Sequence, residues 1–293
     1  QVSDSWLALP RLHQSSEDQW YARREEALAK LHVVSLGSFC GMKFSIQRLG
    51  LGAAHLPFDW IRSRSAGVAR FLRTGFVDFF SIASAFDLQS AGMRVHRAME
   101  HSFWHDDVSQ PEVRNKMRRR AVRFMQLAEA QDSRDLLFIR SCACTEELRE
   151  VEDLYAALAE LFKTDEAPDR RIFLALVVDG QEYREGPIFL ESTPGLLVLL
   201  QPLVSQERAM QGEAFCWAIA AACDQVLAPD GQKAGKEGSE DSSARTSRCF
   251  SNPAELLNGG GAFPPLAFCD AGLHSGYTDL DCFEPPGAQH IDL

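Results

Sequence analysis

Four short, almost uninterrupted apolar runs place the strongest constraint on the fold of this chain. Patterns typical of helices lie between them, and the runs cover residues 31–36, 135–140, 171–178 and 195–200. A strand that is apolar on both sides has to be covered on both faces, and helical crossovers between parallel strands supply that cover. The sequence therefore predicts an α/β fold with a central, mostly parallel sheet flanked by helices, preceded by an N-terminal helical lead-in.

Length and composition fit a chain that buries a substantial core. It has 293 residues, of which 45% are hydrophobic and 24% charged. We expect a helical lead-in over 1–30, an α/β domain over 31–227, a disordered or flexible insertion over 228–262 and a C-terminal segment over 263–293 that packs back on the domain. The insertion is rich in Gly, Ser and charged residues and has little to bury.

Charge and motif content exclude several classes of protein. A net charge of -11 argues against a general nucleic-acid binder, which needs a basic surface to neutralise phosphates. No apolar run approaches the ~18 residues of a membrane span, and the polar first 26 residues are unlike a signal peptide. Neither a phosphate-binding glycine loop nor a paired cysteine motif for zinc is present, so we expect no cofactor and no metal.

The eight cysteines indicate the compartment. Their irregular spacing in a long chain is unlike a disulfide scaffold and indicates reduced thiols. We therefore expect a cytoplasmic protein, and the sequence leaves open a targeting segment ahead of residue 1.

Cys40 lies where the first apolar run gives way to a helical pattern. The stretch Val33-Val34-Ser35-Leu36-Gly37-Ser38-Phe39-Cys40-Gly41-Met42 joins a strand to a helix through a Gly/Ser turn. A thiol at such a turn lies near helix N–H groups and the positive end of the helix dipole, which both lower a cysteine pKa. The N–H groups of Cys40 and Gly41 would also suit an oxyanion. The same pattern fits a buried, inert cysteine equally well.

A cysteine nucleophile needs a base, and the base needs an orienting group. His105 is the first candidate, because Trp104 before it would limit water and Asp106 after it would favour the imidazolium. His101 would share a face with His105 only if this segment were helical.

A second arrangement lies near the C-terminus. Asp270 follows an apolar run that could be a last strand, and His274 comes four residues later. The order Cys40…Asp270…His274 resembles that of serine esterases whose serine follows the first strand. An esterase-like enzyme is therefore an alternative.

Asp59 is a further candidate, in the stretch Pro57-Phe58-Asp59-Trp60. An acid between two large aromatic residues is costly to bury unless it is paired. It either orients the catalytic histidine or caps a helix that starts near Ser63.

A basic helix is predicted over residues 111–130, with its cations concentrated between Arg114 and Arg123. The simpler interpretation is a solvated helix face. The alternative is a binding site for an acidic or phosphate-bearing partner, which would make the protein a non-catalytic binding module.

Several sequence blocks occur in a fixed order: Val34–Cys40, Leu49, Pro57–Trp60, His105-Asp106, an Arg-rich helix with Arg119 and Arg123-Phe124, and Leu136–Arg140. Over about residues 32–140 the chain resembles a domain-of-unknown-function family labelled "putative papain-like cysteine peptidase". The resemblance implies a Cys/His active site, at Cys40 and His105 here.

At two positions that bear on substrate binding, the chain departs from the pattern expected of this family. The segment 52–55 lacks an expected arginine, and Asp107 stands where an aromatic residue is expected. Papain-like enzymes usually carry the cysteine on a helix and the histidine on an antiparallel sheet, whereas the pattern here predicts alternating α/β structure. Similar catalytic groups recur on unrelated folds, so both expectations are kept.

The function expected from these observations is thiol-dependent hydrolysis or acyl transfer on an unknown peptide, amide or ester. Cys40 would attack a carbonyl, and His105 would take its proton and later return it. Asp59 or Asp106 would orient His105, and the N–H groups of Cys40 and Gly41 would stabilise the oxyanion.

Overall fold

The computed structural model describes residues 23–88, 92–129, 132–142, 145–164, 167–202, 204–228 and 248–259. Most of the expected insertion and all of the C-terminal segment lie outside these ranges, and so do Asp270, His274 and the run before them. The esterase-like arrangement therefore stays a prediction.

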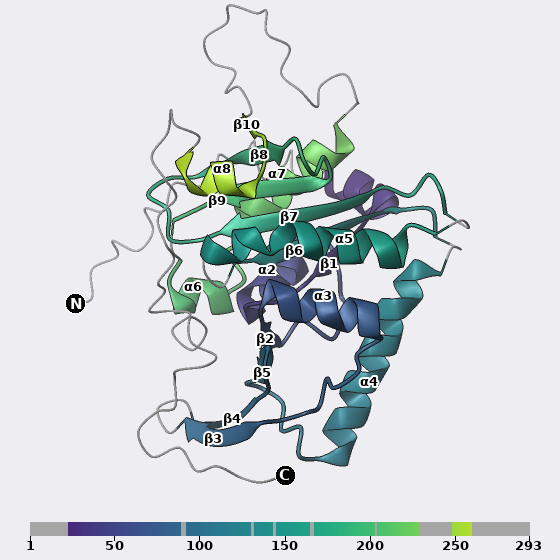
Figure 1. Cartoon of the computed structure of the whole chain (residues 1–293), viewed down its shortest axis with the longest axis vertical. Coiled ribbons are helices and arrows are strands. Elements are labelled where there is room, and N and C mark those ends of the chain that lie inside the picture. Colours follow the sequence, from purple (N-terminus) through teal and green to yellow (C-terminus); the bar gives the residue numbers. More distant parts are fainter. Residues whose placement is uncertain are drawn as a thin grey trace, which may run out of the picture.

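A six-stranded sheet forms the centre of the molecule, in the order β1-β6-β7-β9-β8-β10 (Figure 1). Its strands are β1 (Leu31–Ser35), β6 (Asp135–Ser141), β7 (Ile172–Val178), β8 (Glu185–Leu190), β9 (Leu196–Leu200) and β10 (Cys249–Phe250). The first four in this order are mutually parallel, while β8 runs antiparallel to β9 and pairs in parallel with β10. The predicted α/β fold with a mostly parallel central sheet is confirmed.

Alternate residues of the central strands face two separate cores. In β6, Leu136 and Phe138 belong to one core, whereas Leu137 and Ile139 belong to the other. This follows from the two-residue period of a strand, and it explains why the runs in the sequence are continuously apolar.

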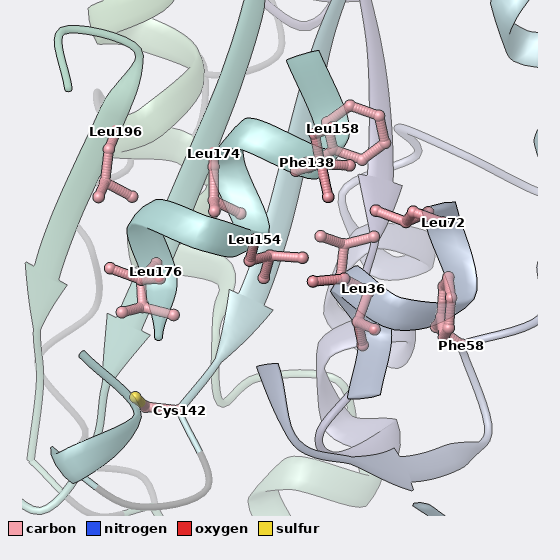
Figure 2. Packing of buried hydrophobic residues seen from close by; sticks show 14 of the residues in the cluster. Leu36, Phe58, Leu72, Phe138, Cys142, Leu154, Leu158, Leu174, Leu176 and Leu196 are labelled. Carbon is pink, nitrogen blue, oxygen red and sulfur yellow. The ribbon is translucent and has the colours of Figure 1, made fainter. Parts of the chain in front are cut away.

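Helices cover both faces of the sheet. The first core is closed by α3 (Ser65–Thr74), α4 (Pro111–Met125), α5 (Val151–Phe162) and α8 (Pro253–Leu257). The second is closed by the helical residues 23–30, α2 (Cys40–Arg48), α6 (Gln206–Met210) and α7 (Cys216–Leu227). Figure 2 shows Leu36, Phe58 and Leu72 on one side of the first core and Leu174, Leu176 and Leu196 on the other.

Local differences from the predicted elements have identifiable causes. Two helices rather than one lie between residues 206 and 227, because Gly212 between α6 and α7 has a φ of 74° that interrupts helical geometry. A short 3-10 turn, η4 (Thr145–Arg149), precedes α5, and another, η3 (Gln126–Ala128), follows α4. Within the expected flexible insertion, residues 249–250 form β10 and residues 253–257 form α8, whose N-cap is Asn252.

An antiparallel sheet is inserted between β1 and β6. It has the order β2-β5-β4-β3 and consists of β2 (Ile61–Ser63), β3 (Ser84–Leu88), β4 (Met93–Arg97) and β5 (His101–Phe103). Figure 1 shows it extending from the β1 edge of the central sheet, with α4 running alongside from one sheet to the other. The sequence did not reveal this sheet, because its strands are short and their aromatic residues looked like simple core.

Candidate active site

The site lies at the carboxyl end of β1. The chain leaves β1 for α2 in the second core, whereas it leaves the neighbouring strand β6 for α5 in the first core. Open α/β sheets bind ligands where the connections of two adjacent parallel strands diverge to opposite faces. Cys40 is the first residue of α2, so the topology itself places this thiol at such a point.

The turn before Cys40 is fixed by its backbone geometry. Gly37 has a φ of 75° and Ser38 a φ of 73°, both in the left-handed region. A Cβ on Gly37 would lie 2.3 Å from the carbonyl oxygen of Phe58 and 3.3 Å from that of Ile61. Only glycine allows this close approach, and it holds the turn against the segment that leads into β2.

Cys40 is nearly enclosed, with 8% of its surface exposed. Burial raises the pKa of its thiol, while the charge of Arg62 and hydrogen bonds from the N–H groups of Cys40 and Gly41 lower it. The lowered pKa predicted from the helix N-terminus is therefore wrong in its net direction, because loss of water outweighs the favourable dipoles. The resting side chain at neutral pH is a thiol, and attack on a carbonyl would need a base.

His105 lies in the loop directly after β5. Its ring makes an edge contact with Trp60, with 6.3 Å between centroids, and Trp60 in turn lies 5.0 Å from the ring of Phe44 on α2. Part of the residue is open to solvent, and loss of water from the rest lowers its pKa. Asp106 raises that pKa and Arg62 lowers it.

Arg62 is therefore an electrostatic neighbour of both candidate reactive groups, since its charge acts on Cys40 and on His105. It is the middle residue of β2, and its guanidinium lies 3.6 Å from the centre of the Trp104 ring. The charge of one arginine thus acts on both the cysteine at the N-terminus of α2 and the histidine in the loop after β5. Arg62 was not among the residues that the sequence suggested for the site. The sequence feature that could have indicated it is its position two residues after Trp60.

Asp106 is held by the basic helix. It is buried, and its carboxylate pairs with Lys116 and lies 3.6 Å from Arg120, both on α4. Elsewhere on α4, Arg123 donates to the carbonyl of His55 at 2.5 Å. These cations hold the two loops of the site, which the solvated-face interpretation did not foresee. A partner for the basic helix stays a prediction.

Asp59 is fully buried and fastens its own loop to α2. Its carboxylate accepts from the N–H of Leu56 at 2.8 Å and lies 3.3 Å from Nζ of Lys43, which itself donates to Ala54. Burial raises the pKa of Asp59 to about 6. The capping role considered for it is wrong: α3 begins at Ser65, whose N–H bonds to Glu147 instead.

Arg140 is a second residue that the sequence did not single out as part of the site. Its guanidinium connects the turn after β1 to β2 and to the start of α3. It is completely buried at the end of β6 and pairs with Glu147 at 3.0 Å. It donates to the carbonyls of Leu36 at 3.1 Å and Ser63 at 2.5 Å, and to the hydroxyl of Ser65 at 3.0 Å. An arginine that closes an apolar run was the available signal, since such a cation has to find partners.

His101 is a core residue. It lies in β5 with its ring stacked on Phe79 at 5.0 Å between centroids, and it contacts the carbonyl of Phe79 at 2.9 Å. Burial lowers its pKa to about 4. The segment is a strand rather than a helix, so the condition under which it would share a face with His105 is not met.

The described part of the chain contains neither a metal site nor a membrane-spanning helix. Its residues contain no group of three or more His, Cys, Asp or Glu side chains arranged to hold a metal ion. Among the same residues, no helix has the length and apolar character to cross a membrane.

The fold and site define an α/β protein with a buried thiol at the first helix after β1 and a histidine in the loop that follows an inserted antiparallel sheet. The chain belongs to the domain-of-unknown-function family described as "Putative papain-like cysteine peptidase (DUF1796)", whose model matches residues 31–180. That range runs from β1 to just beyond β7 and includes every described residue proposed for the site.

One curated relative is an uncharacterized protein, R408, of Acanthamoeba polyphaga mimivirus. It is 36% identical to the chain over 72 residues, which is 24% of this chain and 31% of the relative. The match therefore spans less than a third of that protein. No solved structure matches the chain.

Proposed function

We propose that the protein is a thiol-dependent hydrolase or acyltransferase with Cys40 as nucleophile and His105 as base. The observation that carries the proposal is the series of ring contacts from His105 through Trp60 to Phe44 on α2. Cys40 begins this helix, where the connections after β1 and β6 diverge. The family description supports thiol hydrolase chemistry at a coarse level.

The proposed reaction has two transfers at one sulfur. His105 takes the proton of the Cys40 thiol as Sγ attacks a carbonyl carbon, and the N–H groups of Cys40 and Gly41 donate to the developing oxyanion. The protonated histidine then gives its proton to the leaving amine or alcohol, which leaves a thioester. Water, or another nucleophile in acyl transfer, loses a proton to His105 as it attacks the thioester. The acyl group leaves the sulfur, and His105 returns the proton to Sγ of Cys40.

Asp106 is the carboxylate we assign to support His105. Its charge raises the pKa of His105 and stabilises the imidazolium formed during the reaction. Asp59, the other candidate, bonds to Leu56 and Lys43 and therefore holds the loop that carries Trp60.

Acetylation by p-nitrophenyl acetate tests the proposal without a known substrate. We expect one acetyl group on Cys40, found by mass spectrometry of digested protein, and loss of ester turnover in Cys40→Ala and in His105→Gln. Cys216→Ala is the matched control, because burial raises the pKa of this half-buried thiol to about 11 and it lies outside the site. Undiminished turnover in Cys40→Ala would reject the proposal, as would an unlabelled Cys40.

A further inference from the structure

A buried thiol that has to become anionic needs a positive charge close by. We propose that Arg62, rather than an imidazolium at His105, supplies the positive charge that stabilises the Cys40 sulfur as it loses its proton. This inference rests on the proposed function and divides the work at that site: His105 moves the proton, and Arg62 balances the charge left behind.

The strand that carries Arg62 is fastened to the turn that carries the thiol. Gly37 packs against the carbonyl of Ile61, the residue before Arg62. Arg140 donates to the carbonyls of Leu36 and of Ser63, the residue after Arg62. Both neighbours of Arg62 in β2 are thus fixed to the β1–α2 turn, so the distance between this strand and Cys40 is set by the buried frame.

The guanidinium itself is held in place. Arg62 pairs with Ser102 across the β2–β5 ladder, and Trp104, two residues after Ser102, provides the ring against which the guanidinium stacks at 3.6 Å. The Trp104 Nε1 donates to the hydroxyl of Ser102 at 2.8 Å, which fixes the orientation of the ring. A cation over an indole face is stabilised by the ring quadrupole and needs no carboxylate to hold it.

Nearby cations on the packed elements have acidic partners of their own. Lys43 on α2 pairs with Asp59, and Lys116 and Arg120 on α4 face Asp106. On α6, which meets α2 at Gly41 through Ala209, Arg208 pairs with Glu213. Arg62 differs from them because its charge reaches the reactive groups.

The charge of Arg62 lowers both pKa values, which favours the charged form of one residue and the neutral form of the other. The charge of Arg62 lowers the pKa of Cys40, which favours the anionic sulfur. It also lowers the pKa of His105, which favours the neutral imidazole that can accept a proton. A positive charge disfavours an imidazolium at His105, so these directions fit a thiol with a neutral base.

Alkylation by iodoacetamide measures this charge effect directly, because the thiolate is the reacting form. The rate at Cys40 is followed from pH 6 to 10 by mass spectrometry. In Arg62→Gln we expect the profile to move to higher pH by about one unit, a roughly tenfold slower reaction at pH 7. Arg62→Lys keeps the charge and should restore most of the rate. His105→Gln should leave the midpoint within about 0.3 unit.

Arg94→Gln is the matched control, since it removes one exposed arginine from β4 of the same sheet. Its profile should coincide with that of the unaltered protein. An unchanged midpoint in Arg62→Gln would overturn the inference, and so would a midpoint that rises in His105→Gln alone. In both cases Cys40 is still alkylated and acetylated, so the proposed function survives. Failure of Cys40 to react with either reagent would remove both.

Discussion

At the scale of single residues, the site contains ionisable groups that the fold buries. Cys40, Asp59 and Arg140 are each enclosed, and each takes its properties from what surrounds it. The sequence identified Cys40 and Asp59 as candidates because their positions were unusual. It could not give the net direction of the Cys40 pKa, because that depends on how much water the fold removes.

Asp59 should give the protein a measurable pH dependence. Burial raises its pKa to about 6 from an ordinary value of 3.8. The folded protein thus binds a proton that the unfolded chain has lost, so this carboxyl stabilises the fold at low pH and the contribution is lost as pH rises through 6. Relative to Asp59→Asn, the unaltered protein should lose up to about 3 kcal/mol of unfolding free energy between pH 4 and 7.

Urea unfolding at several pH values measures this difference. Asp87→Asn serves as the control, because it makes the same substitution at an exposed side chain. A constant difference for Asp59→Asn would show that this carboxyl titrates normally.

At the scale of elements, an antiparallel sheet inserted into an α/β fold bears on two expectations that conflicted in the sequence. The cysteine begins a helix after a parallel strand, and the histidine follows β5 of the inserted sheet. The helix position of the cysteine agrees with the papain-like expectation, whereas His105 lies in the loop two residues beyond β5 rather than in a strand. The turn between β1 and α2 joins the two parts.

That turn should tolerate no side chain at Gly37. Gly37→Ala would place a Cβ against the Phe58 carbonyl, in addition to adopting a left-handed conformation. Gly75→Ala is the matched control: its φ is 64°, but nothing lies within 4 Å of its Cβ position. We expect Gly75→Ala to cost about 1–2 kcal/mol and Gly37→Ala about 1–3 kcal/mol more.

The measurement is urea unfolding of both variants, together with the acetylation of Cys40. Gly37→Ala should also slow acetylation, because the turn has to move away from β2. Equal stability losses in the two variants would show that the close approach at Gly37 is not maintained.

At the scale of the whole molecule, the core extends past the region that defines the family. The family match ends at residue 180, whereas β9 pairs with β7 and all five of its residues are buried. Of these, Leu197 and Leu199 lie in the second core, which α7 helps to close. The later part of the chain therefore completes the sheet that carries the site.

A fragment of residues 31–180 should not fold cooperatively. It would expose the edge of β7 that pairs with β9, together with the apolar surface that β9 and α7 cover. The free energy of burial lost in this way exceeds the usual unfolding free energy of a domain. The full chain should show a cooperative urea transition. A sharp transition in the shorter fragment, followed by circular dichroism, would contradict this expectation.

The sequence by itself determined the α/β class, the parallel strands and Cys40 at the first strand–helix turn, because apolar periodicity and turn residues are local signals. It also pointed to His105 and, through the resemblance, to the family. Only the tertiary structure decided that Arg62 adjoins both residues, that Arg140 fastens the turn to β2, and that burial raises the Cys40 pKa. These are contacts between segments far apart in the chain, and their energies depend on desolvation, which exists only once the chain has folded.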